Sequence, residues 1–84
     1  MVRKKNNGYG ICVYDDELNH SEFVVDVISN AFGYHKTQAY QCVNMIEING
    51  KYIVKKYTSK EHDKALKFTN FLVQNGLLAE IISL

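Results

Sequence analysis

Two adjacent carboxylates, Asp15 and Asp16, are the residues of this sequence best placed to do chemistry. They follow a run of β-branched and aromatic residues, Tyr9–Tyr14, that is typical of a strand. Carboxylates have low strand propensity, so the pair is expected in a loop at the end of that strand. There it could hold a cation, or Asp16 could act with Glu47 as an acid and base pair. Nothing else in the sequence supports hydrolysis, and we expect recognition without catalysis.

The histidines and cysteines do not have the spacing of a metal site. His20, His35 and His62 fall in a loop and at two helix starts, too scattered for one ion. Cys12 and Cys42 lack a Cys-x-x-Cys spacing and have no histidine at zinc-ligand distance. We therefore expect two buried, reduced thiols, no metal and no cofactor.

The length and net charge of the chain limit the classes of protein to which it can belong. The chain has 84 residues with 46% apolar content, which fits one small core. Its net charge of +1 gives no basic footprint for nucleic acid. No apolar run reaches the roughly 18 residues of a membrane span, and no signal peptide is recognisable. These features predict a cytoplasmic monomer with no nucleic acid and no membrane among its partners.

The helices are indicated by apolar spacing and by their ends. Apolar residues recur at helical spacing up to Phe32, where Gly33 supplies a left-handed cap. Asn19 and Glu22 have the spacing of a capping box before this helix, and Thr58 and Glu61 repeat it before the last helix. A middle helix, with Ala39, Cys42, Val43 and Ile46 along one stripe, is expected to end near Asn49 and Gly50.

Two more strands complete the expected order β-α-α-β-α-β. Residues 51–57 alternate, with Tyr52 and Val54 on one face and Ile53, Lys55 and Tyr57 on the other. Residues 77–84 are short and rich in Ile and Leu. We predict an α/β (α+β) two-layer sandwich, a three-stranded antiparallel sheet with three helices on one face. Residues 1–8 are predicted to form a short flexible tail and residues 9–84 a single domain.

Several motifs of this chain occur together, in this order and near this spacing, in one family. They are Tyr14-Asp15-Asp16, Glu22 to Val27 (Glu-Phe-Val-Val-Asp-Val), Phe32-Gly33-Tyr34, Ala39, Asn49-Gly50 and Tyr57-Thr58. On these residues the chain resembles ClpS, the Clp protease adaptor family, from about Gly8 to its C-terminus. The resemblance implies the ClpS fold, which is also that of the C-terminal domain of the ribosomal stalk protein.

The resemblance also implies a function and a site. Members of the family bind proteins whose first residue is bulky and apolar or aromatic, and hand them to a Clp AAA+ unfoldase of the ClpA or ClpC type. An Asn-Asp-Asp loop and a histidine grip the ammonium of the substrate, beside an apolar pocket. By position, the loop falls on Tyr14, Asp15 and Asp16, and Glu47 stands in place of the histidine.

The remaining positions carry over in the same way. The pocket wall falls on Val24, Val43, Ile46 and Leu77, and His20 or Ser21 lies near the place of the methionine that guards the entrance. A weaker correspondence places the unfoldase-docking surface at Tyr57, Thr58 and Lys60. Tyr14 and Glu47 depart from the family pattern and motivate an alternative. In that alternative the chain keeps the fold as an interaction module, stalk-like or a divergent adaptor, without binding N-termini.

Overall fold

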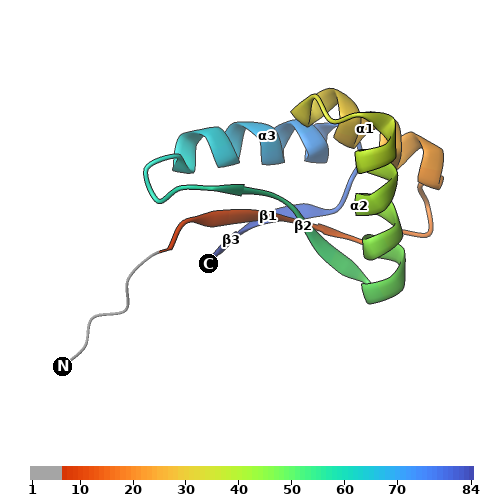
Figure 1. The fold of residues 1–84 in the computed structure, drawn as a ribbon, viewed down its shortest axis with the longest axis horizontal. Helices are drawn as coiled ribbons and strands as arrows, with labels where there is room; N and C mark the ends of the chain where they lie inside the picture. The colour runs from red at the N-terminus through yellow and green to blue at the C-terminus, as the bar shows by residue number, and fades with distance from the viewer. Residues whose placement is uncertain (1–6) are drawn as a thin grey trace.

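The computed structural model describes residues 7–84, and its helices and strands follow the predicted order. The elements are β1 (Tyr9–Tyr14), α1 (Ser21–Phe32), α2 (Lys36–Asn49), β2 (Lys51–Tyr57), α3 (His62–Gln74) and β3 (Ala79–Ser83). Figure 1 shows the helices on one side of the sheet and the other side uncovered. The predicted two-layer sandwich is confirmed. Residues 1–6, which make up most of the predicted tail, lie outside the described residues.

The sheet has the order β2-β1-β3, and both pairings are antiparallel. Strand β1 lies between the other two strands and is the most buried of the three. Ile11 and Val13 point into the core under the helices, and Cys12 is buried on the opposite face. At the start of this strand Gly8 has φ +114°, and a Cβ atom there would lie 2.2 Å from the carbonyl oxygen of Tyr57. Only glycine allows this close approach.

The predicted alternation along β2 is wrong in its second half. Ile11 pairs with Lys55 and the next residue, Cys12, pairs with Ile53, so Val54 is an extra residue in the ladder. Such a β-bulge shifts the faces of the residues that follow it. Tyr57 therefore lies in the core on the helix side, instead of on the face of Ile53.

The helix ends agree with the predictions at their C-termini more than at their N-termini. Gly33 and Gly50 adopt the predicted left-handed conformation, with φ of 69° and 82°. The first capping box is wrong, because His20 is the N-cap of α1 and makes no side-chain cap bond. Only one of the two hydrogen bonds of the second capping box forms. The Glu61 carboxylate accepts a hydrogen bond from the backbone N–H of Thr58 at 2.9 Å. The N-cap of α3 is Glu61 and not Thr58, and the helix begins at His62.

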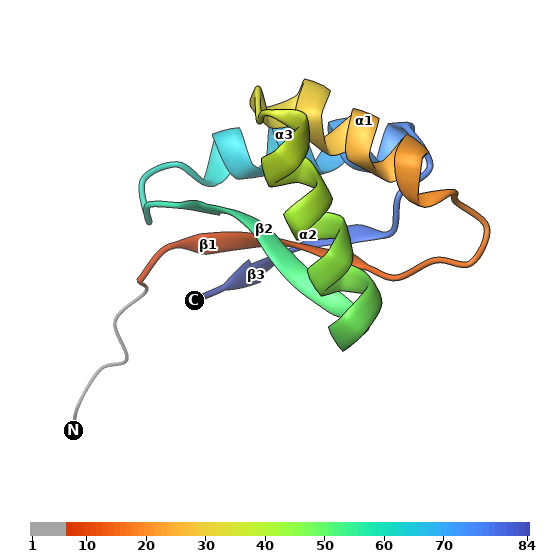
Figure 2. The same cartoon turned by 45° about the vertical axis from the view of Figure 1, so that its right-hand side comes forward.

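One apolar core joins the two layers. Helices α2 and α3 pack on the sheet, whereas α1 packs mainly on α2 and α3, so not every helix lies against the strands as expected. Figure 2 shows α2 crossing the sheet edge toward the start of β2. The fully buried side chains Ile28 and Leu72 link the helices to Ile11. Within residues 7–84, no helix has the length and apolar character needed to cross a membrane.

Both cysteines are free and buried, as the sequence predicted. Cys42 belongs to the core cluster, and its burial raises the pKa of the thiol above its ordinary value. A raised pKa keeps the sulfur protonated and weakly nucleophilic at neutral pH. Cys42 is therefore a packing residue of the core, and Cys12 is buried on the opposite face of the sheet.

Candidate functional site

A hollow of about 330 Å³ opens where the β1–α1 loop meets the end of α2 and the entry to β3. We call it the acidic hollow. The loop that forms one side extends beyond the end of the sheet (Figure 2). Its lining combines apolar side chains with four carboxylates and three further polar or aromatic residues. They are Val13, Val24, Val43, Ile46, Leu77 and Leu78; Asp15, Asp16, Glu17 and Glu47; and Tyr14, Asn19 and Ser21.

The apolar wall of the acidic hollow is the outer surface of the core. Val43 and Ile46 are three residues apart on α2, so they share one helix face. Leu77 is held in place because its backbone N–H donates to the carbonyl of Leu72 at the end of α3. These three side chains are at most 4% exposed, whereas Val24 on α1 is only half-buried. The structure thus brings together the four apolar residues that the resemblance assigned to a pocket.

Asp16 organises the loop that borders the acidic hollow. Its Oδ1 atom accepts a hydrogen bond from the backbone N–H of Leu18 at 2.9 Å, and its Oδ2 atom accepts one from Asn19 Nδ2 at 3.2 Å. Asn19 Nδ2 also donates to the carbonyl oxygen of Gly76 at 3.0 Å. Asn19 therefore ties this loop to the α3–β3 turn on the other side of the hollow, which explains why it does not cap α1.

Glu47 and Ser21 join two helices at the hollow. The Ser21 hydroxyl, in the first residue of α1, donates to Glu47 Oε2 near the end of α2 at 3.1 Å. The other carboxylate oxygen of Glu47 receives no hydrogen bond from the residues described. Glu47 thus stands at the rim with a negative charge and one oxygen available to a ligand.

Tyr14 borders the acidic hollow, but its phenol is engaged on the uncovered face of the sheet. The hydroxyl donates a hydrogen bond to Glu80 Oε1, on the strand residue that pairs with Cys12. This hydrogen bond, with burial as a smaller cause, raises the pKa of Tyr14 to about 12. The phenol stays protonated and occupied, so the hydroxyl of Tyr14 does not replace the amide that the family has here.

The remaining predicted residues fall in different places. Asp15 lines the acidic hollow as expected, whereas His20 is exposed at the start of α1 and does not line it. Ser21, the alternative to His20 in that prediction, does line the hollow. Of the predicted docking residues, Thr58 and Lys60 are exposed, but Tyr57 is 8% exposed and stacks on Phe68. The Tyr57 ring is therefore a core residue, because of the bulge at Val54.

Four residues of the acidic hollow were not predicted from the sequence: Val13, Glu17, Asn19 and Leu78. Glu17 directly continues the Asp15-Asp16 pair, so the run of acidic residues was a signal for it. Asn19 carries a signal too, but its spacing to Glu22 predicts a local helix cap and not a place at the hollow. No group of three or more His, Cys, Asp or Glu side chains within the described chain could hold a metal ion.

These features define a small two-layer α/β domain that offers a ligand a hollow with an apolar wall and an acidic rim. The model of one family, ATP-dependent Clp protease adaptor protein ClpS, matches residues 4–72. The chain belongs to the ClpS family, which is a family of adaptors and not of proteases. No curated protein sequence gives a significant match.

A solved structure agrees with this assignment at the level of the fold. The structure of Agrobacterium tumefaciens ClpS2 bound to L-phenylalaninamide superimposes with a TM-score of 0.76. The match covers 95% of this chain and 100% of that chain, at 14% sequence identity. The two chains share the fold with very different side chains, so this likeness shows the fold and not the site.

Proposed function

We propose that the acidic hollow binds the free N-terminus of substrate proteins that begin with a bulky apolar or aromatic residue, and that the chain delivers them to a Clp AAA+ unfoldase. One observation carries the proposal: carboxylates and a nearly buried apolar wall line the same hollow. The α-ammonium of a peptide needs a carboxylate and hydrogen-bond acceptors, and an apolar recess beside them suits the first side chain.

The charges of this hollow favour a free N-terminus over a modified one. An ammonium can donate to the exposed carboxylate of Asp15 and to the unoccupied oxygen of Glu47. An acetylated N-terminus has no positive charge and one N–H donor instead of three, so a carboxylate desolvated by the bound peptide would lose its partner. The hollow should therefore reject acetylated peptides.

The relative of known structure supports the chemistry of the ligand. Agrobacterium tumefaciens ClpS2 was solved with L-phenylalaninamide, a molecule with a free amino group, an aromatic side chain and no charged carboxylate. These are the features of the first residue of a protein. A volume of about 330 Å³ is large enough for one aromatic side chain with its amino group.

Delivery to an unfoldase is supported by the family and by exposed polar residues. Thr58 and Lys60 are exposed between β2 and α3, and neither lines the acidic hollow. Thr58 is held by Glu61, whose pKa is lowered chiefly by the hydrogen bond from the Thr58 backbone. An ordered, exposed turn away from the hollow can contact an unfoldase while the substrate stays bound.

The direct test is fluorescence anisotropy with peptides that begin in Leu, Phe, Tyr or Trp. We expect saturable binding of the free peptides and at least about tenfold weaker binding of their N-acetylated forms, because a charge-assisted hydrogen bond is lost. Equal binding of both forms would contradict the proposal. If no peptide binds at all, the chain is better described as an interaction module that keeps the ClpS fold.

A further inference from the structure

We infer that a second copy of this chain docks on the open edge of β3. The two β3 strands pair antiparallel, the two sheets join into one, and the two α3 helices pack beside each other. The inference does not involve the acidic hollow and is independent of the proposed function. The sequence predicted a monomer, which we expect at low concentration, with a weak dimer forming as the concentration rises.

The backbone of β3 directs a row of polar groups away from the sheet. The N–H of Tyr14 donates to the carbonyl of Leu78 at 2.9 Å, so the even-numbered residues of this segment bond to β1. Hydrogen bonding alternates along an antiparallel strand, so the other residues direct their N–H and C=O groups outward. The strand order β2-β1-β3 leaves this side without a neighbouring strand. The outward residues are Ala79, Ile81 and Ser83.

The opposite edge of the sheet, on β2, is protected against such pairing. It carries the bulge at Val54, and the carbonyl of Val54 is already occupied by the Tyr34 hydroxyl. Bulges and lysines are the usual means of blocking an edge strand. Strand β3 has no lysine and no proline, and its register with β1 has no irregularity. The edge of β3 is therefore the one available for pairing. The lysines of β2 are Lys51, Lys55 and Lys56.

The residues of β3 suit a two-fold antiparallel pairing centred on Ile81. In that register Ala79 lies opposite Ser83 of the second copy, and the outward residues of both strands exchange about six hydrogen bonds. Glu80 is the one charged residue of β3, and it lies opposite Ile82 of the second copy, so like charges do not meet. The pairing satisfies the open edge of both copies without electrostatic repulsion.

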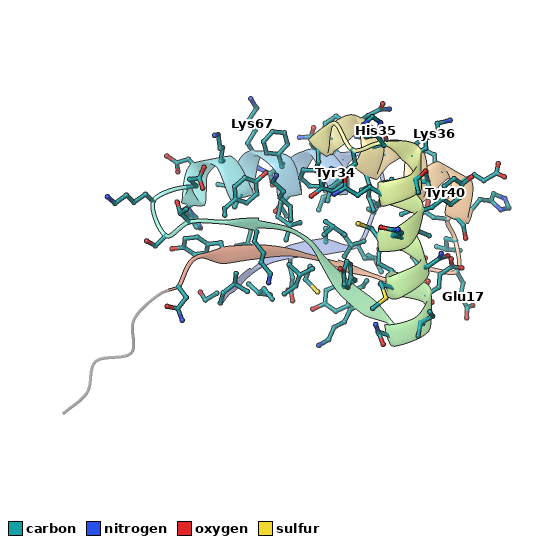
Figure 3. All side chains as sticks on the ribbon, in the orientation of Figure 1. Glu17, Tyr34, His35, Lys36, Tyr40 and Lys67 are labelled. Carbon is teal, nitrogen blue, oxygen red and sulfur yellow. The ribbon has the colours of Figure 1, made fainter. Side chains whose placement is uncertain are left out.

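Helix α3 adds an apolar flank on the same side of the molecule. Phe68 and Phe71 face α1, and Figure 3 shows Lys67 pointing away from the sheet. Leu66 and Val73 are seven residues apart, so they share the remaining flank, where they are 44% and 49% exposed. Helices α1 and α2 pack together on the side of β2, so this flank lies on the side of the β3 edge.

The spacing of the two layers agrees with one arrangement. Helix α3 packs on both β1 and β3, and Figure 1 shows it running along the sheet. Two neighbouring strands are about 4.8 Å apart, so pairing β3 with its copy places the two α3 axes about 10 Å apart, two strand spacings. Packed helices have axes about 8–10 Å apart. The same docking therefore joins the strand edges and brings the apolar flanks together.

A second copy fits this surface better than an extended segment of another protein. A single strand would satisfy the backbone of β3 but leave Leu66 and Val73 exposed, whereas a second copy covers both layers at once. One short strand edge and one helix flank bury less than the standard interface of about 800 Å² per partner. We therefore expect a weak dimer, with a dissociation constant on the order of 100 μM.

Sedimentation equilibrium over a concentration series tests for the dimer. The weight-average mass should rise from that of one chain, 9.7 kDa, toward twice this value. The series should run from about 5 μM to about 1 mM, on either side of the expected dissociation constant. A mass of one chain at every concentration would overturn the inference.

Amide exchange followed by NMR locates the surface. The N–H groups of Ala79, Ile81 and Ser83 should exchange about fourfold more slowly at about 1 mM than at about 20 μM, because the dimer protects them. Glu80 and Ile82 are the internal control, since they pair with Cys12 and Gly10 of β1 in either state. Equal effects on both sets of N–H groups would contradict pairing through this edge.

Variants test the two layers separately. Ser83→Pro removes an outward N–H and keeps the bonds to β1, so it should weaken association at least about tenfold, whereas Ser83→Ala should not. Val73→Lys should weaken association by a similar factor, because it places a charge in the apolar contact. Ile48→Lys is its control, since Ile48 is 76% exposed on α2.

Circular dichroism and urea unfolding establish that each variant is folded before its mass is measured. Folded Ser83→Pro and Val73→Lys proteins that remain monomeric at about 1 mM, with both controls dimeric, are the result expected. A dimer that persists in both folded variants would show that a different surface joins the copies, and the inference would fall.

Discussion

Asp15 and Asp16 are neighbours in the sequence with different surroundings. Asp15 is exposed, and only its Oδ1 atom accepts a hydrogen bond, from the backbone N–H of Asp16 at 3.1 Å. Both oxygens of Asp16 hold the loop together through Leu18 and Asn19. Because Asp15 has the freer carboxylate, we expect it to be the loop's main partner for a ligand ammonium, with Asp16 positioning it.

Replacing each aspartate by asparagine separates these roles. Asp15→Asn should weaken peptide binding at least about tenfold and leave the urea midpoint unchanged, because the lost interaction is with the ligand. Asp16→Asn should lower the free energy of unfolding by about 1 kcal/mol as well, because an amide nitrogen would then face the Asn19 amide. Anisotropy and urea unfolding of both variants measure the two effects. A fully stable Asp16→Asn variant with normal binding would show that the loop does not depend on this carboxylate.

At the scale of the elements, the bulge in β2 depends on a tyrosine from the link between α1 and α2. The Tyr34 hydroxyl donates to the carbonyl oxygen of Val54 at 2.8 Å, at the extra residue of the ladder. The Tyr34 carbonyl in turn accepts from the Ser29 hydroxyl at 2.6 Å. Tyr34 thus fixes the helix link to the strand, at the point where the faces of β2 change.

Tyr34→Phe should lower the free energy of unfolding by about 1–2 kcal/mol, since the partly buried Val54 carbonyl loses its donor. The effect should depend on pH. Burial raises the pKa of Tyr34 above its ordinary value of 10.0, because the folded state favours the neutral phenol. The contribution of this phenol is therefore complete below about pH 10 and is lost as the pH rises through the folded pKa.

Urea unfolding at a series of pH values checks this. The difference in stability between the unchanged protein and Tyr34→Phe should be constant from about pH 7 to 9 and shrink above about pH 10. Tyr40→Phe is the matched control, because Tyr40 is exposed on α2 with no hydrogen bond in the described structure. A Tyr34→Phe variant as stable as Tyr40→Phe would show that the bulge does not need the hydroxyl.

The hydrogen bonds of Tyr34 and of Asn19 also show why some features of the fold could be predicted from the sequence and others could not. Strand β1 and the Gly33 cap depend on local patterns, apolar β-branched residues and a left-handed φ, and both predictions were confirmed. The bulge and the role of Asn19 depend on partners 20 and 57 residues away, which no local pattern contains. The four apolar residues named from the family resemblance line the hollow, whereas nothing in the local sequence pattern indicates that Val13 and Leu78 line it too.

At the scale of the whole molecule, one small core serves both stability and the site. A domain of 84 residues buries a limited share of its surface, so it has few apolar side chains to reserve for a ligand. Val43, Ile46 and Leu77 accordingly belong to the core cluster and to the wall of the acidic hollow at once. Val24 differs, because it is only half-buried and packs at the edge of the core.

This sharing predicts that wall substitutions divide into two kinds. Ile46→Ala should lower the free energy of unfolding by about 2–4 kcal/mol, since it leaves a cavity in the core. Val24→Ala should cost less than about 1.5 kcal/mol, because it removes less buried surface, yet it should widen the hollow and weaken the binding of Leu-initial peptides. Urea unfolding and anisotropy on the same samples separate stability from affinity. Equal stability losses for the two variants would show that Ile46 is not a core residue, and unchanged affinity in Val24→Ala would show that the first side chain of the ligand lies elsewhere.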